Sequence, residues 1–475
     1  MKHETPPQMP IRATPYKHQR EAFNEALTTF NSEKSRGYAL LCKMGVGKSI
    51  ISVAIAGQLY LNNHIHCVLI VAPLSILGVW QEEFANFADF DYTLTILTGV
   101  LTKKAETLRN LTGKPLQVAV VNYESAWRIE KQITSWHPDL IIADESHKIK
   151  NHAASASKAM HRLGAKASYR LALTGTPITN KAIDIFSQYK FLSPEIFGNS
   201  FYSWRNRYFD LCGYGNYTPI MKRNMEVEFT SKMHSIAFRA TKAQCLDLPA
   251  TTDITRSVEL EPTAAKLYRD LVKDSYAELG NGEVTSTNIL TRLLRLSQLT
   301  GGFVSPDGEK PQSVSTAKLD ALADIVETAA QEGRKLVIIA RFVAEIAAIK
   351  ALLDKQGITY SAISGETKNR AEQVSQFQEN PDVTVFIGQI QTAGLGITLT
   401  AASTMVFYSM DYSMSNFEQA KARIHRVGQS QPCTYIYLIA KNTVDEKVLT
   451  VLHDKANLAK VLIDDYRKGT NPYGQ

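Results

Sequence analysis

Residues 38–50 read Tyr-Ala-Leu-Leu-Cys-Lys-Met-Gly-Val-Gly-Lys-Ser-Ile, an apolar run followed by a glycine-bearing turn. A buried strand, a glycine turn and a helix in this order form a cradle for the phosphates of a nucleotide. Gly45 and Gly47 allow the backbone N–H groups to approach the phosphates closely. Cys42 stands where the usual pattern has a further glycine, so a chance match remains the alternative for this stretch alone.

The polar residues of this loop have the chemistry that a nucleotide requires. The Lys48 ammonium can reach the β and γ phosphates, and the Ser49 hydroxyl is a suitable ligand for Mg²⁺. ATP and Mg²⁺ are therefore the expected ligands. The residues expected to bind the nucleotide here are Met44, Gly45, Val46, Gly47, Lys48 and Ser49.

The composition is that of a globular protein. The 475 residues are enough for two or more domains, and 44% hydrophobic with 21% charged residues exclude a disordered or fibrous chain. The net charge of +7 is compatible with a polyanionic partner without requiring one. Five cysteines without close spacing predict neither a zinc site nor disulfides, which fits a reducing compartment.

The N-terminal residues 1–12 are polar and lack the apolar core of a secretory signal. The longest strongly apolar stretch, residues 68–79, is too short to cross a bilayer. We therefore expect no membrane association. The expected location is the cytoplasm (the nucleoid or a host-cell interior), or the nucleus if the source is eukaryotic.

Two groups of short, continuously apolar runs alternate with helix-patterned segments. The first group lies within residues 38–173 and the second within residues 336–408. Continuous apolar runs are typical of parallel strands that helices cover on both faces. The predicted fold class is α/β, with two lobes that each contain a mostly parallel sheet.

The strand signal becomes weak between the two groups, and the Pro249 region interrupts the helical pattern. We expect an N-terminal lobe over residues 1–248, with a helical insertion at about 193–240. The C-terminal lobe is expected over residues 249–475, with a helical segment at about 262–300 leading in. The aromatic and basic stretch 200–210 could grip DNA or pack at the interface of the lobes, and packing is the favoured expectation.

Asp144 and Glu145 directly follow an apolar run and are expected at the carboxyl end of a buried strand. Ligands of open parallel sheets bind beyond those ends. Asp144 can hold Mg²⁺, and Glu145 can orient and deprotonate the water that attacks the γ-phosphate. The alternative is a solvated acidic turn.

Two further segments of the first lobe have weaker signals. The Gln19 amide both donates and accepts, which matches the edges of adenine, although a plain helix N-terminus is the alternative. Thr174, Gly175 and Thr176 follow another apolar run and can relay the state of the nucleotide site. A simple turn is the alternative for that segment.

Taken in order, these segments resemble the SWI/SNF-type DNA-dependent ATPases of helicase superfamily two. The resemblance implies two tandem RecA-like lobes and covers about residues 12–450. It rests on the segments at residues 15–19, 44–49, 71–80, 144–151 and 173–180.

The stretch 419–429 is the decisive segment of the second lobe. At helical spacing, Gln419, Arg423 and Arg426 fall on one side, and arginine forms paired hydrogen bonds to phosphate oxygens. A basic helix that faces solvent or DNA phosphates is the alternative. The stretch is similar to the sixth motif of the family, which implies that Arg423 and Arg426 complete the ATP site. We expect Gln419 to couple that site to movement, and we expect the same of Thr174, Gly175 and Thr176.

The resemblance also implies contacts with a nucleic-acid backbone. The stretch 391–400 is similar to the fifth motif, where Thr392 and Thr398 can donate to phosphates and Gly396 is expected near the nucleotide. Arg341 follows an apolar run in a region similar to the fourth motif.

The chemistry and the resemblance together predict a motor that hydrolyses ATP on double-stranded DNA, moving along it or remodelling protein–DNA complexes. Because its grip would be on phosphates, binding is expected to be independent of sequence. A strand-separating DNA or RNA helicase is one alternative, and a non-hydrolysing clamp gated by ATP is another. The 475 residues contain no segment resembling a chromodomain or bromodomain, so a motor without reader domains is expected. The expected catalytic residues are Lys48, Asp144, Glu145, Arg423 and Arg426.

Overall fold

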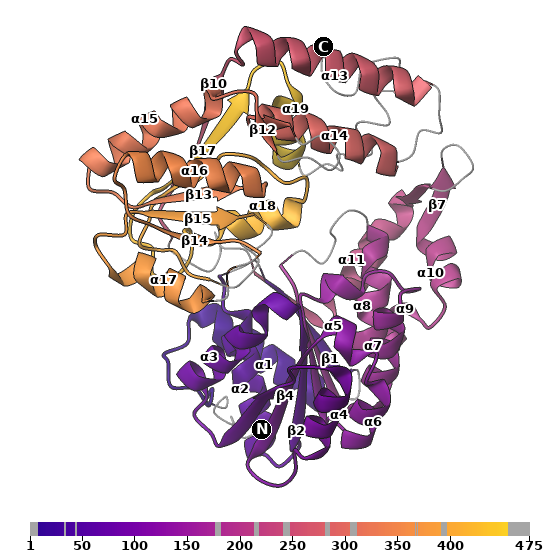
Figure 1. The fold of residues 1–475 in the computed structure, drawn as a ribbon. Coiled ribbons are helices and arrows are strands. Elements are labelled where there is room, and N and C mark those ends of the chain that lie inside the picture. Colours follow the sequence, from indigo (N-terminus) through magenta and orange to yellow (C-terminus); the bar gives the residue numbers. More distant parts are fainter. Residues whose placement is uncertain are drawn as a thin grey trace. The chain divides into compact units, whose positions relative to one another are not determined.

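The chain divides into two compact units, Met1–Asp247 and Leu248–Gln475, and each is described by itself (Figure 1). The computed structural model describes residues 8–32, 35–42, 45–175, 182–212, 218–240, 248–280, 286–304, 311–365, 367, 369–390 and 397–454. Among these residues, no helix has both the length and the apolar character needed to cross a membrane.

The first unit is built on a seven-stranded sheet in which every neighbouring pair is parallel. Apart from the two edge strands, its strands are almost continuously buried, as the apolar runs predict for strands with helices on both faces. In sheet order they are β3 (Tyr92–Ile96), β4 (Leu116–Asn122), β2 (Cys67–Ala72), β5 (Leu140–Asp144), β6 (Tyr169–Leu173), β1 (Gly37–Cys42) and β9 (Ala237–Ala240).

Two rows of helices cover this sheet, one row on each face (Figure 1). One row consists of α1 (Lys17–Asn31), α2 (Lys48–Leu61) and α3 (Leu77–Phe87). The other contains α4 (Leu101–Arg109), α5 (Tyr123–Ala126), α6 (Glu130–Trp136), α7 (Ser155–Lys166) and α8 (Ile185–Leu192).

The region expected to be a helical insertion also contains strands. Helices α9 (Pro194–Phe197), α10 (Phe201–Tyr208) and α11 (Glu226–His234) accompany an antiparallel hairpin of β7 (Phe209–Cys212) and β8 (Thr218–Met221). The next strand, β9, pairs with β1 at the sheet edge. Within α10, Trp204 and Tyr208 are buried in the core of the first unit itself.

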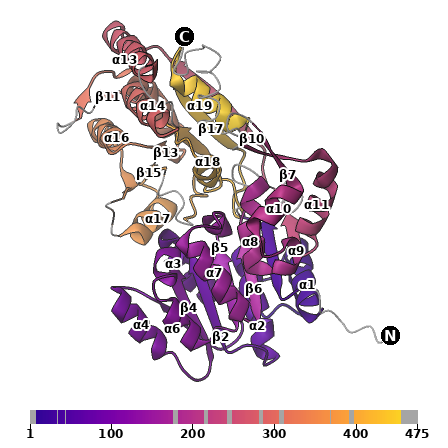
Figure 2. The same ribbon diagram turned by 90° about the vertical axis from the view of Figure 1, so that its right-hand side faces the viewer.

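The second unit has a six-stranded parallel sheet. Figure 2 shows its edge strand β10 lying beside β17. In sheet order the strands are β10 (Thr251–Val258), β17 (Cys433–Ala440), β16 (Thr404–Phe407), β13 (Leu336–Ala340), β15 (Val385–Gln389) and β14 (Tyr360–Ile363).

The two faces of this sheet have separate hydrophobic cores, because alternate residues of a strand point to opposite faces. On β13, Val337 and Ile339 belong to one core, whereas Leu336 and Ile338 belong to the other. Helices α15 (Ala317–Gln331) and α16 (Val343–Lys355) cover the second core. The first core is covered by α13 (Pro262–Gly280), α14 (Ser286–Thr300), α17 (Arg370–Glu379), α18 (Met414–Lys421) and α19 (Val444–His453). The prediction of two α/β units with mostly parallel sheets is confirmed.

Candidate active site

The predicted phosphate loop connects β1 to α2 in the first unit. Gly45 and Gly47 have φ angles of 82° and 94°, a left-handed conformation that residues with a Cβ rarely adopt. Gly47, which has no side chain, is the N-cap of α2. The first N–H groups of α2 therefore point out of the helix end beside a glycine turn, an arrangement suited to an anion. Met44 lies outside the described residues.

Lys48 and Ser49 begin α2, so both are on its first turn. The Lys48 Nζ donates a hydrogen bond to the carbonyl oxygen of Cys42 at 3.0 Å. Its charge is close enough to Asp144 to oppose the rise in the pKa of that carboxyl. The structure thus brings Lys48 and Asp144 together, although 95 positions separate them in the sequence.

Gln19 is buried beside this loop. Its Oε1 accepts from the backbone N–H of Tyr16 at 2.9 Å, and its Nε2 donates to the carbonyl oxygen of Val46 at 3.4 Å. His18 Nε2 donates to the same carbonyl at 2.9 Å. A Cβ on Gly47 would lie 2.3 Å from Gln19 Nε2. The Gln19 amide therefore contacts the phosphate loop directly, and its role toward adenine stays a prediction.

Asp144 ends β5, and four neighbouring groups define its environment. Its Oδ2 accepts from Trp80 Nε1 at 3.0 Å and its Oδ1 from the Glu145 N–H at 2.9 Å, while Tyr123 donates to its carbonyl oxygen at 2.8 Å. Burial and the negative charge of Glu145 raise the pKa of Asp144 to about 7, against the opposing effect of Lys48. A divalent cation at this carboxylate would favour its ionised form.

Glu145 is held by an unusual backbone conformation. Its φ of 49° is in the left-handed region, which is uncommon for a residue with a long side chain. Its Oε2 lies 3.2 Å from His147 Nδ1. Backbone strain of this kind is concentrated at functional sites. The geometry therefore favours a functional role for Asp144 and Glu145 over a solvated acidic turn.

Sequence reasoning assigned no role to Trp80 or Tyr123. Trp80 lies within the segment 71–80 that carried the family resemblance, and Tyr123 directly follows β4. Each provides the single donor of an aromatic ring, which in a buried position needs an acceptor. Tyr123 could have been found as an aromatic donor directly after a predicted buried strand, whereas Trp80 lies inside α3 and has no such signal.

Thr174 and Gly175 follow β6, the strand between β5 and β1 in the sheet. Thr174 is fully buried, and its N–H donates to the carbonyl oxygen of Leu40 at 3.2 Å. The segment therefore lies at the same end of the sheet as the phosphate loop. Thr176 is outside the described residues, and the coupling role of the segment stays a prediction.

In the second unit, the helix expected to carry both arginines ends before them. Helix α18 finishes at Lys421, and residues 422–428 form turns, so the expectation of one continuous helical face is wrong. The reason is that tertiary donors take the carbonyls that a longer helix would need. The Leu399 N–H donates to the Arg423 carbonyl at 3.0 Å, and Gln429 Nε2 donates to the Ile424 carbonyl at 3.1 Å.

The two arginines nevertheless converge. Arg423 Nη1 and Arg426 Nη1 both donate to the carbonyl oxygen of Ile397, at 3.5 and 3.4 Å. Arg423 is almost fully buried. Gln419 lies one turn earlier on α18, where its Nε2 donates to Ser415 Oγ at 3.3 Å. Thr398 follows Ile397 in sequence, whereas Thr392 and Gly396 fall outside the described residues.

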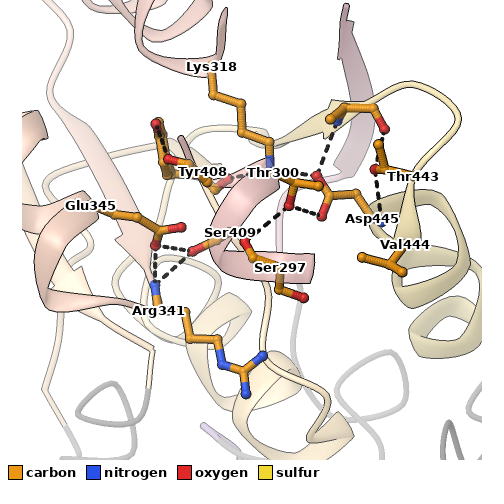
Figure 3. A network of polar contacts seen from close by, with 12 residues as sticks. Ser297, Thr300, Lys318, Arg341, Glu345, Tyr408, Ser409, Thr443, Val444 and Asp445 are labelled. Atoms are coloured by element: carbon orange, nitrogen blue, oxygen red, sulfur yellow. Dashed lines mark hydrogen bonds and ion pairs between the residues drawn. The ribbon is translucent and has the colours of Figure 1, made fainter. Parts of the chain in front are cut away.

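Arg341, expected at a nucleic-acid backbone, belongs to a buried polar network (Figure 3). Its backbone N–H donates to Glu345 Oε2 at 3.1 Å and to Ser409 Oγ at 2.8 Å. Its guanidinium stacks over the ring of Tyr412, with 3.9 Å between the guanidinium carbon and the ring centroid. The guanidinium carbon also lies 5.1 Å from the centroid of the Phe342 ring, and the phosphate contact stays a prediction.

The described residues contain no cluster of three or more histidine, cysteine, aspartate or glutamate side chains that could hold a metal ion. A metal in the first unit would therefore need ligands of another kind, such as phosphate oxygens and water. Mg²⁺ is usually bound in this manner, through one or two protein groups together with phosphates. Ser49 and Asp144 fit that pattern.

Known families and relatives match most of this chain. The family model described as the SNF2-related domain matches residues 18–301, and that of the helicase conserved C-terminal domain matches residues 317–428. An uncharacterized ATP-dependent helicase of Mycoplasma pneumoniae is 29% identical over 444 residues, which cover 91% of this chain and 41% of that protein. The chromodomain-helicase-DNA-binding protein 1-like of Danio rerio is 24% identical over 458 residues, with coverages of 92% and 43%.

Among solved structures, the Sulfolobus solfataricus SWI2/SNF2 ATPase core in complex with dsDNA is 26% identical, with a TM-score of 0.47 and coverages of 98% and 96%. The chain spans about two-fifths of the length of the curated relatives named above. The SNF2-related model alone covers more than half of the chain. The chain therefore belongs to the SNF2-related family, the SWI/SNF-type ATPases of helicase superfamily two.

Proposed function

We propose that this chain is a DNA-stimulated ATPase that moves along double-stranded DNA or remodels protein–DNA complexes. The observation that carries the proposal is the group formed by Lys48, Asp144 and Glu145 at the carboxyl ends of the strands of one sheet. This group combines a cation for phosphate, a carboxylate for a metal and a second carboxylate for water.

The chain's own residues divide the work on ATP. The glycine turn and Lys48 bind the phosphates, and Gln19 is proposed to contact the adenine. Glu145 holds the attacking water and accepts its proton. Bound Mg²⁺ would neutralise phosphate charge, with Ser49 and Asp144 as its protein ligands. Arg423 and Arg426 of the second unit stabilise the charge that develops on the γ-phosphate.

Hydrolysis is coupled to movement because the contacts of Arg423 and Arg426 with the γ-phosphate exist only while ATP is bound. Binding favours the state in which both units contact the nucleotide, and loss of phosphate removes that preference. Thr174, Gly175, Thr176 and Gln419 are proposed to transmit this change. Arg341, Thr392 and Thr398 are proposed to hold phosphates of the tracked strand, which makes DNA binding independent of sequence and sensitive to salt.

The relatives support DNA as the partner, since the Danio rerio protein is described as DNA-binding and the Sulfolobus core is described in complex with dsDNA. The test is the rate of ATP hydrolysis with double-stranded DNA, single-stranded DNA and RNA. We expect the strongest stimulation by double-stranded DNA and none in Glu145→Gln. Equal phosphate release by wild type and variant would refute the catalytic assignment and favour a clamp that only binds ATP.

A second experiment separates a translocase from a strand-separating helicase. Displacement of a triplex-forming strand reports movement along duplex DNA, whereas separation of a blunt duplex reports unwinding. We expect the first without the second. Efficient unwinding of the blunt duplex would favour the helicase alternative.

A third experiment tests the division of labour between the two units. Lys48→Ala should weaken ATP binding, whereas Arg426→Ala should retain binding and lose turnover. Nucleotide affinity measured for both variants checks this. Equal losses of affinity would contradict the separate roles of the lysine and the arginine.

A further inference from the structure

The turn that carries the two arginines is tied to the first strand of the second unit. That strand, β10, begins at Thr251, and the residues just before it, Leu248 to Ala250, are the first of the unit. It is an exposed edge strand that pairs along all eight of its residues with β17. Since β17 follows the arginine turn in the chain, β10 and the turn are neighbours.

Asp253 of β10 makes the first of two tethers. Its Oδ1 accepts from Lys421 Nζ at 2.7 Å and from the Tyr437 hydroxyl at 2.6 Å. These two hydrogen bonds lower the pKa of Asp253 although partial burial opposes them, so its carboxylate is charged at neutral pH. Lys421 is the last residue of α18, two positions before Arg423.

Lys421 is held on several sides, so its position is well defined. Its Nζ also donates to the Tyr437 hydroxyl at 3.0 Å and lies 4.2 Å from the centroid of the Tyr435 ring. The Tyr435 hydroxyl donates to the Lys421 carbonyl oxygen at 2.9 Å. The end of α18 is therefore fixed to β17 and, through Asp253, to β10.

His425 makes the second tether. Its Nε2 donates to the carbonyl oxygen of Pro249 at 2.9 Å. His425 lies between Arg423 and Arg426 in the sequence, and Pro249 lies directly before β10. The two tethers thus hold the chain on both sides of Arg423, and both bond it to residues 248–253 at the start of the second unit.

We propose that Asp253 and Pro249, acting through Lys421 and His425, position Arg423 and Arg426 for ATP hydrolysis. Asp253 and Lys421 are positioning residues, since neither is assigned a contact with the nucleotide. A shift of the chain where it enters the second unit moves both anchors and hence the arginine turn. The inference rests on the proposed role of the arginines at the γ-phosphate.

The test compares Asp253→Ala with a matched change on the same strand. Arg256→Ala removes an exposed ion pair from β10 to Asp324 of α15, 3.5 Å long, which does not involve the arginine turn. We expect Asp253→Ala to lower kcat at least tenfold with KM for ATP and the melting temperature nearly unchanged, and Arg256→Ala to leave kcat unchanged. If both variants have the same kcat, or if Asp253→Ala changes only KM, the inference is overturned.

A conservative variant separates positioning from a general structural role. Asp253→Asn keeps an oxygen acceptor for Lys421 and Tyr437, so kcat should recover to within about threefold of wild type. Failure of Asn to recover more activity than Ala would contradict positioning through these hydrogen bonds. Arg426→Ala, assayed in parallel, distinguishes the two proposals. If Arg426→Ala retains ATP turnover, the proposed function is wrong. If Arg426→Ala loses turnover while Asp253→Ala has normal turnover, only this inference is refuted.

Discussion

Replacing Glu345 with glutamine should remove a pH dependence of stability from the second unit. Glu345 is fully buried on the first turn of α16. Its Oε2 accepts from the Arg341 N–H at 3.1 Å and from Ser409 Oγ (Figure 3). It also accepts from the Phe342 N–H at 3.0 Å. Its Oε1 has no hydrogen-bond partner among the described residues and packs against Gly301, where an added Cβ would lie 2.0 Å away.

The magnitude follows from the pKa of this carboxyl. Burial raises the pKa of Glu345 from 4.5 to about 7, against the hydrogen bonds and the Lys318 charge that lower it. The folded state thus holds the proton more tightly than the unfolded state. The contribution of the Glu345 carboxyl to the free energy of unfolding is fully present below pH 4.5 and is lost as the pH rises through 7. The loss amounts to about 3 kcal/mol.

Hydrogen exchange is the suitable assay because all four tryptophans lie in the first unit, so fluorescence does not report on the second. Protection of residues 343–355, corrected for intrinsic exchange, should fall in wild type between pH 5 and pH 8. In Glu345→Gln it should remain constant over that range. The neutral amide keeps an oxygen acceptor for the two N–H groups and has no proton to lose.

Glu327→Gln on α15 is the matched control, because Glu327 is exposed and its replacement should leave the pH profile unchanged. The reasoning would be refuted if wild type and Glu345→Gln differed by the same free energy at pH 5 and pH 8. It would also be refuted if wild type gained stability relative to the variant as the pH rises, because the carboxyl would then be charged in the folded state.

Two predictions concern the first unit. Trp80→Phe removes the donor to Asp144 Oδ2 and should lower kcat for ATP hydrolysis about tenfold or more with the fold retained, since hydrogen bonds to charged groups contribute about 1.5–3 kcal/mol. Turnover measured at saturating ATP checks this, and an unchanged kcat would contradict it. Gly57→Ala places a Cβ 2.2 Å from the Phe90 ring and should destabilise the unit by about 1–3 kcal/mol, although alanine has the better helix propensity. Gly78→Ala is the control, because its Cβ meets nothing within 4 Å and should not destabilise the unit. Urea unfolding followed by tryptophan fluorescence compares the two variants.

The sequence predicts the central strands of both sheets, because helices cover them on both faces and they are largely apolar. The same reasoning missed β9, whose four residues include an arginine and are mostly half-buried. An edge strand pairs on one side only and needs no continuous apolar run, so composition cannot reveal it. Its partner β1 is almost 200 residues away, and only the folded sheet brings the two together.

The positions of Lys48 and Asp144 in the first unit were predictable, because the glycine turn indicates where α2 begins and the apolar run indicates where β5 ends. Trp80 was not, because its contact with Asp144 depends on how α3 packs on β3 and β4 rather than on any local pattern. A local motif identifies the groups that carry charge. The neutral donors that orient those groups come from distant parts of the chain.

The arginine turn shows why a local rule can give a correct grouping for the wrong reason. Helical spacing predicted that Arg423 and Arg426 lie on one side, and both do reach the Ile397 carbonyl. They do so from turns whose carbonyls are hydrogen-bonded to Leu399 and Gln429, so their convergence depends on contacts distant in sequence. A continuous helix would hold the arginines by its own hydrogen bonds. A turn held by tertiary bonds can instead be moved by its neighbours, and this makes the first strand of the second unit able to act on the arginines.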